Sequence, residues 1–79
     1  MSSSKVLVYS TPSCPYCVRA KRYLAEKGVK YTDIDVSKNS EQAQKMVKKS
    51  GQMGVPVIEI NGNIIVGFNQ SKIDYFLNK

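Results

Sequence analysis

The sequence has few cysteines, no histidine and no long apolar run. It contains two cysteines among 79 residues. Two cysteines are too few for the disulfide framework of a small secreted scaffold, and without histidine they supply only half of a tetrahedral zinc site. No apolar run approaches the roughly 20 residues of a membrane span, and the first residues lack the apolar core of a secretory signal. We therefore expect one domain over residues 1–79 in the reducing cytoplasm, with residues 1–4 as a short disordered lead.

Acidic residues are also scarce, with six Asp and Glu against twelve Lys and Arg and a net charge of +6. Such a surface favours anionic small molecules and acidic protein faces through long-range attraction. Lys45, Lys48 and Lys49 are interpreted as a solvated surface. We expect neither a membrane nor a nucleic-acid partner, because no recognition motif accompanies the charge. Nothing in the pattern demands a second copy, so we expect a monomer.

Apolar periodicity and turn residues predict an α/β chain in the order βαβαββα. Strands are predicted at 5–9, 30–36, 57–60 and 63–66. Helices are predicted to begin at Pro15, at Asn39 or the residue after it, and after Asn69. Asn61-Gly62 is a strong hairpin signal. The expected fold is a four-stranded mixed sheet with three helices on its two faces, which is the minimal thioredoxin fold.

The cysteines stand at the predicted turn from the first strand into the first helix. Cys14 and Cys17 are separated by Pro15 and Tyr16. A Cys-x-x-Cys at such a turn is typical of a redox motif, because the pair can open and close a disulfide. Cys14 lies at the amino end of the helix, where negative charge is favoured, and is predicted to be the nucleophile. Cys17 is predicted to be the buried resolving thiol.

Other interpretations of the cysteine pair stay open. A static disulfide or two inert buried thiols would be structural features only. The basic residues that follow the pair, Arg19, Lys21 and Arg22, support the thiolate only if their side chains lean back toward the turn.

Three segments resemble the glutaredoxins. The run Thr-Pro-Ser-Cys-Pro-Tyr-Cys at 11–17 is similar to the dithiol active site of that family. Gly54-Val55-Pro56 resembles its Thr-Val-Pro segment, and 67–69 lies where its glycine turn enters the last helix. The resemblance runs from about residue 5 to residue 79. It implies a glutathione-dependent thiol–disulfide oxidoreductase that reduces protein disulfides and glutathione mixed disulfides, with glutathione as co-substrate and no metal.

The resemblance also implies a glutathione groove. Pro56 would be cis and face Cys14, and the backbone of Val55 would pair with the cysteinyl part of glutathione. The N–H groups of Asn69 and Gln70 would hold the γ-glutamyl carboxylate. The implied glutathione-binding residues are Thr11, Tyr16, Val55, Pro56, Gly67, Phe68, Asn69 and Gln70.

Three positions depart from the family pattern. Thr11 stands where many glutaredoxins carry Lys or Arg, Gly54 replaces a threonine, and the acidic residue that follows the glycine turn is missing. Gly67-Phe68 is also found in redoxins that thioredoxin reductase reduces and that donate electrons to ribonucleotide reductase. That redoxin function is one alternative. An iron–sulfur cluster carrier, which the stiff Pro15 disfavours, and a basic interaction module are others.

Overall fold

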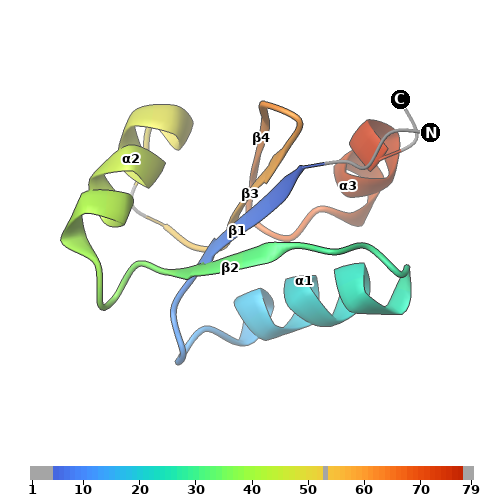
Figure 1. Cartoon of the computed structure of the whole chain (residues 1–79), viewed down its shortest axis with the longest axis horizontal. Coiled ribbons are helices and arrows are strands. Elements are labelled where there is room, and N and C mark those ends of the chain that lie inside the picture. Colours follow the sequence, from blue (N-terminus) through green and yellow to red (C-terminus); the bar gives the residue numbers. More distant parts are fainter. Residues whose placement is uncertain (1–4, 53, 78–79) are drawn as a thin grey trace.

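Short apolar segments form the strands of a single mixed sheet. The computed structural model describes residues 5–52 and 54–77, so the predicted lead at 1–4 lies outside the described residues. In the described part the strands are β1 (Val6–Ser10), β2 (Thr32–Asp35), β3 (Val57–Ile60) and β4 (Asn63–Val66). Their order in the sheet is β2-β1-β3-β4 (Figure 1). β1 and β2 are parallel, and the other neighbours are antiparallel. The predicted mixed sheet is therefore confirmed.

Three helices connect the strands, and local signals mark their starts. They are α1 (Pro15–Glu26), α2 (Ser40–Ser50) and α3 (Gln70–Leu77). Asn39 caps α2 by accepting a hydrogen bond from the backbone N–H of Gln42 at 3.1 Å. Asn69 does the same for α3, where the N–H of Lys72 is the donor at 3.1 Å. These side chains satisfy backbone donors that a helix start otherwise leaves unpaired.

The helices cover both faces of the sheet, as predicted. Because side chains alternate along a strand, Val8 and Tyr9 point to opposite faces. Val8 packs in a cluster with residues of α1 and α3, including Leu24 and Ile73. Tyr9 packs with Met46 of α2 on the other face. Figure 1 shows α2 on one side of the sheet and α1 and α3 on the other.

The predicted hairpin joins β3 to β4. Asn61 and Gly62 have φ angles of 51° and 89°. A two-residue type I′ turn requires positive φ at both central positions, which Asn and Gly tolerate best. The side chain of Asn61 also accepts a hydrogen bond from the backbone N–H of Lys5 at 2.8 Å. The turn therefore holds the start of the described chain against the sheet.

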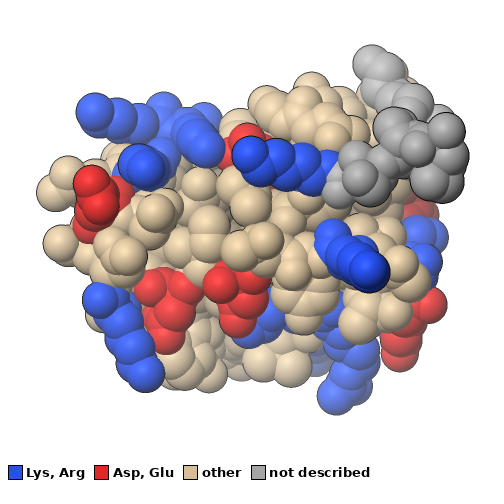
Figure 2. All heavy atoms as spheres, viewed as in Figure 1, with Lys and Arg blue, Asp and Glu red and all other residues tan. Residues whose placement is uncertain are grey.

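Basic side chains gather over α2, as Figure 2 shows. Lys45, Lys48 and Lys49 belong to this helix. Lys49 is more than a solvated residue, because its Nζ lies 2.7 Å from Glu59 and 3.3 Å from the hydroxyl of buried Tyr9. The pKa of Lys49 is raised, chiefly by its hydrogen bond to Glu59. This lysine therefore fastens α2 to the sheet.

Candidate active site

The cysteine pair lies directly beyond the end of β1. The backbone N–H of Cys14 donates to the carbonyl of Thr11 at 3.3 Å, which closes the turn after the strand. Cys14 then caps α1 from an extended conformation, and Pro15 takes the first helical position. Pro suits this position because the missing N–H would be unpaired there anyway. The end of β1, the turn and the start of α1 thus determine where the two cysteines lie.

The two thiols have different surroundings. Cys14 is half-buried and Cys17 is 0 % exposed. The backbone N–H of Cys17 donates to Sγ of Cys14 at 3.3 Å, and the Cys14 thiol lies 3.8 Å from the carbonyl of Val55. A sulfur at a helix start that accepts a backbone N–H is placed where negative charge is stabilised. The accessible sulfur is therefore that of Cys14.

Cys17 is held in the thiol form. Its pKa is raised to about 12, first by burial and then by its hydrogen bond and charge interaction with Cys14. A backbone hydrogen bond from Thr11 and the charge of Lys21 act in the opposite direction. The site thus has an accessible sulfur at Cys14 and a buried, protonated sulfur at Cys17, one helical turn further along α1.

A cis-proline loop lies against the pair. The Val55–Pro56 peptide bond is cis, as the family resemblance implied. Pro56 is buried, and its carbonyl accepts a hydrogen bond from the N–H of Gly67 at 2.8 Å. Gly67 has a φ of 81°, a left-handed conformation that suits glycine. The contacts Cys14–Val55 and Pro56–Gly67 thus join three segments that are far apart in the sequence.

The other predicted groove residues differ in their exposure and in their contacts. Tyr16 is 58 % exposed, and the guanidinium carbon of Arg19 lies 5.5 Å from its ring centroid. Phe68 is half-buried and packs edge-on against Tyr23, with ring centroids 5.8 Å apart. The side chain of Asn69 is occupied in capping α3. Phe68 and the Asn69 side chain therefore have structural contacts of their own.

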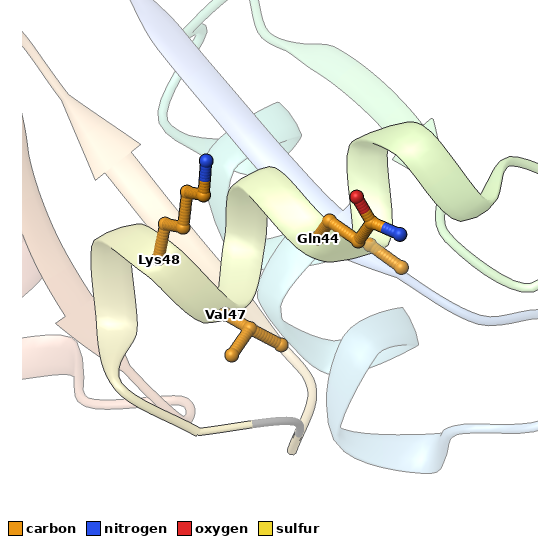
Figure 3. A pocket seen from close by; sticks show the side chains of 4 residues that line it. Gln44, Val47 and Lys48 are labelled. Atoms are coloured by element: carbon orange, nitrogen blue, oxygen red, sulfur yellow. The ribbon is translucent and has the colours of Figure 1, made fainter.

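Described residues line surface hollows in at least two places. The first lies between α1 and the start of α3 and is lined by Arg19, Arg22, Tyr23, Glu26, Phe68 and Gln70. The second lies on α2 and is mainly apolar; Gln44, Val47 and Lys48 line it together with Ala43 (Figure 3). Only the first contains predicted site residues.

One polar cluster near the pair was not predicted from the sequence. Ser10, at the end of β1, donates to Asp33 at 2.6 Å, and Lys21 donates to the other oxygen of Asp33 at 3.0 Å. The spacing of Lys21, four residues after Cys17 on one helix, was the available signal. The part played by Asp33 depends on the pairing of β1 with β2, which local patterns do not reveal.

Within residues 5–52 and 54–77, no cluster of three or more Cys, Asp or Glu could hold a metal ion. None of the helices in these residues has the length and apolarity needed to cross a membrane.

The chain is similar to several known proteins. The family model described as glutaredoxin matches residues 6–65. A glutaredoxin-like 8.6 kDa protein from the rubredoxin operon of Clostridium pasteurianum is 45% identical over 74 residues, 94% of this chain and 99% of that protein. Glutaredoxin 3 of Escherichia coli K12 is 38% identical over 64 residues, 81% of this chain and 77% of that protein.

Solved structures show the same arrangement. The crystal structure of a glutaredoxin from Archaeoglobus fulgidus has a TM-score of 0.88 and 26% identity, covering 96% of this chain and 88% of that one. This likeness confirms the predicted thioredoxin-like fold. The matched range of the family model includes Cys14, Cys17 and the Val55–Pro56 loop but ends before Gly67.

Proposed function

This chain belongs to the glutaredoxin family, and on that premise we propose that it is a glutathione-dependent thiol–disulfide oxidoreductase. Cys14 is the nucleophile and Cys17 is the resolving thiol. The observation that carries the proposal is the contrast between the two sulfurs. Cys14 is half-buried and accepts a backbone N–H at a helix start, whereas Cys17 is fully buried beside it.

The proposed reaction reduces a substrate disulfide to two thiols. The Cys14 thiolate attacks one sulfur of the substrate, forms a mixed disulfide and releases the other sulfur, which takes up a proton. Cys17 loses its proton and attacks the Cys14 sulfur. The Cys14–Cys17 disulfide forms, and the second substrate thiol leaves with a proton. Two glutathione thiols then reduce the protein disulfide and are themselves oxidised to glutathione disulfide.

Glutathione is proposed to lie along the cis-proline loop. The backbone of Val55 is next to Cys14, which supports strand-like pairing with the cysteinyl part. The first backbone N–H groups of α3, at Asn69 and Gln70, suit the γ-glutamyl carboxylate, because helix starts favour anions. Tyr16, exposed beside the sulfur, borders this path. The net charge of +6 favours the approach of an anionic peptide.

A second candidate function follows from the positions that depart from the family pattern. Thr11 supplies no cation, the acid after the glycine turn is missing, and Phe68 fills the turn and packs on Tyr23. These features favour a redoxin reduced by thioredoxin reductase, such as an electron donor to ribonucleotide reductase. An iron–sulfur cluster carrier is a weaker alternative, because Pro15 stiffens the segment between the two cysteines and disfavours cluster binding.

The deciding experiment measures NADPH oxidation during reduction of a small mixed disulfide under two electron supplies. One contains glutathione and glutathione reductase, and the other contains thioredoxin reductase. We expect turnover with glutathione. Turnover only with thioredoxin reductase would replace this proposal with the redoxin function.

Two cysteine variants test the assigned roles in the same assay. Cys14→Ser should abolish all turnover, because no other accessible thiol exists in the described residues. Cys17→Ser should lose protein-disulfide reduction but keep reduction of glutathione mixed disulfides, which needs only one thiol. Activity retained in Cys14→Ser would refute the mechanism.

The remaining expectations are proposed on the same basis. Residues 1–79 are proposed to act as one monomeric domain in the cytoplasm, where the dithiol would be kept reduced. Light scattering during gel filtration would test the monomer, because a dimer has twice the mass.

A further inference from the structure

The resolving step of the proposed reaction has a specific difficulty in this protein. Cys17 is 0 % exposed and its pKa is raised to about 12. At pH 7 such a thiol stays almost entirely protonated. Only the thiolate attacks a disulfide. The site therefore requires something that makes the Cys17 thiolate available once substrate is bound to Cys14.

Part of the difficulty disappears when Cys14 enters the mixed disulfide. Two of the causes that raise the pKa of Cys17 are the hydrogen bond to Cys14 and the charge of Cys14. Neither survives when the Cys14 sulfur is bonded to substrate. Burial remains as the cause that opposes ionisation. The groups that favour it are the backbone at Thr11 and the ammonium of Lys21.

The position of Lys21 is fixed by contacts with the sheet. Lys21 follows Cys17 by four residues on α1, so the two side chains share one face of the helix. Its Nζ lies 3.0 Å from Oδ2 of Asp33 in β2, and its side chain is 24 % exposed. The other oxygen of Asp33 accepts a hydrogen bond from Ser10, which is 2 % exposed. A chain of polar contacts thus leads from the buried end of β1 to the lysine.

The neighbouring basic side chains of α1 have other contacts. Arg19 lies over the ring of Tyr16, and Arg22 lines the hollow toward α3. The charged groups that act on the Cys17 thiol are Cys14 and Lys21. On β2, Asp33 pairs with Lys21, and Asp35 is stabilised mainly by hydrogen bonds from Ser37. Among the basic residues of α1, Lys21 is therefore the one whose charge acts on the resolving thiol and whose ammonium is held against the sheet by Asp33.

We propose that Ser10 and Asp33 position the Lys21 ammonium beside Cys17, and that this ammonium promotes the attack of Cys17 on the mixed disulfide. The inference rests on the proposed dithiol mechanism. It assigns Lys21 to the second chemical step and not to the first. Lys21 and Asp33 are positioning residues here, since they act through Cys17.

The test follows both steps in one experiment with an uncharged probe. Reduced protein is mixed rapidly with 4,4′-dithiodipyridine, which releases one thiopyridone when Cys14 attacks and a second when Cys17 resolves. Lys21→Met keeps the aliphatic stem and removes the charge. We expect it to slow the second release about tenfold at pH 7 and to shift the pH profile of that release to higher pH. The first release should stay unchanged.

Matched variants separate charge from structure. Lys21→Arg should restore the second release and its pH profile. Asp33→Asn should slow the second release less than Lys21→Met does, because the ammonium remains but loses its anchor. Lys48→Met on α2 removes the same charge from an exposed site and should change neither release. Circular dichroism confirms that each variant is folded.

The outcomes distinguish this inference from the proposed function. Equal slowing of both releases, or an unchanged second release in Lys21→Met, would overturn the assignment of Lys21 while leaving the dithiol mechanism intact. A first release that survives in Cys14→Ser would instead refute the mechanism itself.

Discussion

At the scale of single residues, the site combines the Cys14–Cys17 dithiol with a proposed glutathione groove that departs from the family pattern. Cys14, Cys17 and the cis-proline loop are in contact. Thr11 stands where many glutaredoxins carry a cation, and the acidic residue that follows the glycine turn in that family is missing here. A lost hydrogen bond to a charged group weakens binding by about 1 kcal/mol or more. We therefore expect a high KM for glutathione substrates and normal chemistry at the sulfur.

Restoring one charge tests this explanation. Thr11→Lys should lower the KM for a glutathione mixed disulfide about fivefold, the effect of about 1 kcal/mol, with little change in kcat. Thr11→Ser is the matched control and should behave like the natural protein. Added salt should reduce the gain, because an exposed ion pair is screened. An unchanged KM in Thr11→Lys would mean that the carboxylate does not approach this position.

At the scale of elements, each helix start is set by a short side chain or a proline, and each helix occupies a defined face of the sheet. α2 depends on Asn39, whose side chain accepts the N–H of Gln42. This helix lies on the face of the sheet opposite α1, which carries the dithiol. Its stability and the redox chemistry should therefore be separable.

Asn39→Ala should lower the free energy of unfolding by about 1 kcal/mol, because a helix N-cap is lost. Asn39→Ser keeps a capping oxygen and should retain most of the stability. Urea unfolding followed by circular dichroism measures both. The thiopyridone release rates of Asn39→Ala should match those of the natural protein, and a slower first release would show that α2 does influence the site.

At the scale of the whole molecule, α1 and α3 are joined by a polar contact between distant parts of the chain. The hydroxyl of Tyr23 donates to Asp74 at 2.6 Å, and Lys27 lies 3.1 Å from the same carboxylate. The pKa of Asp74 is lowered, chiefly by the hydrogen bond from Tyr23 and then by Lys27. This contact joins α1 and α3, the two helices that cover the same face of the sheet.

The lowered pKa predicts a stability that declines in acid. The contribution of Asp74 is complete above its ordinary pKa of 3.8 and is lost as the pH falls through the lower value of the folded state. Tyr23→Phe should lower the melting temperature by a few degrees at pH 7, and this difference should shrink as the pH falls below 3.8. Tyr31→Phe, also half-buried against the same core, is the control. A pH-independent difference for Tyr23→Phe would contradict the role of the hydrogen bond.

The sequence by itself determined the order of the elements and the place of the chemistry. Pro15, Asn39, Asn69 and Asn61-Gly62 act within a few residues, so their effects can be read without knowing the fold. The strand predicted at 30–36 is shorter, at Thr32–Asp35. It lies at the edge of the sheet and pairs only with β1, so its length depends on a partner and not on its own apolar pattern.

Tertiary structure decided the environment of the two sulfurs. Burial of Cys17, the carbonyl of Val55 beside Cys14, and the contact of Lys21 with Asp33 join residues that local patterns treat as independent. Phe68, which was predicted to border the groove, likewise packs on Tyr23 and is only partly exposed. These contacts arise only when the sheet assembles, because strand pairing and helix packing bring distant segments within hydrogen-bond and ring-contact distance.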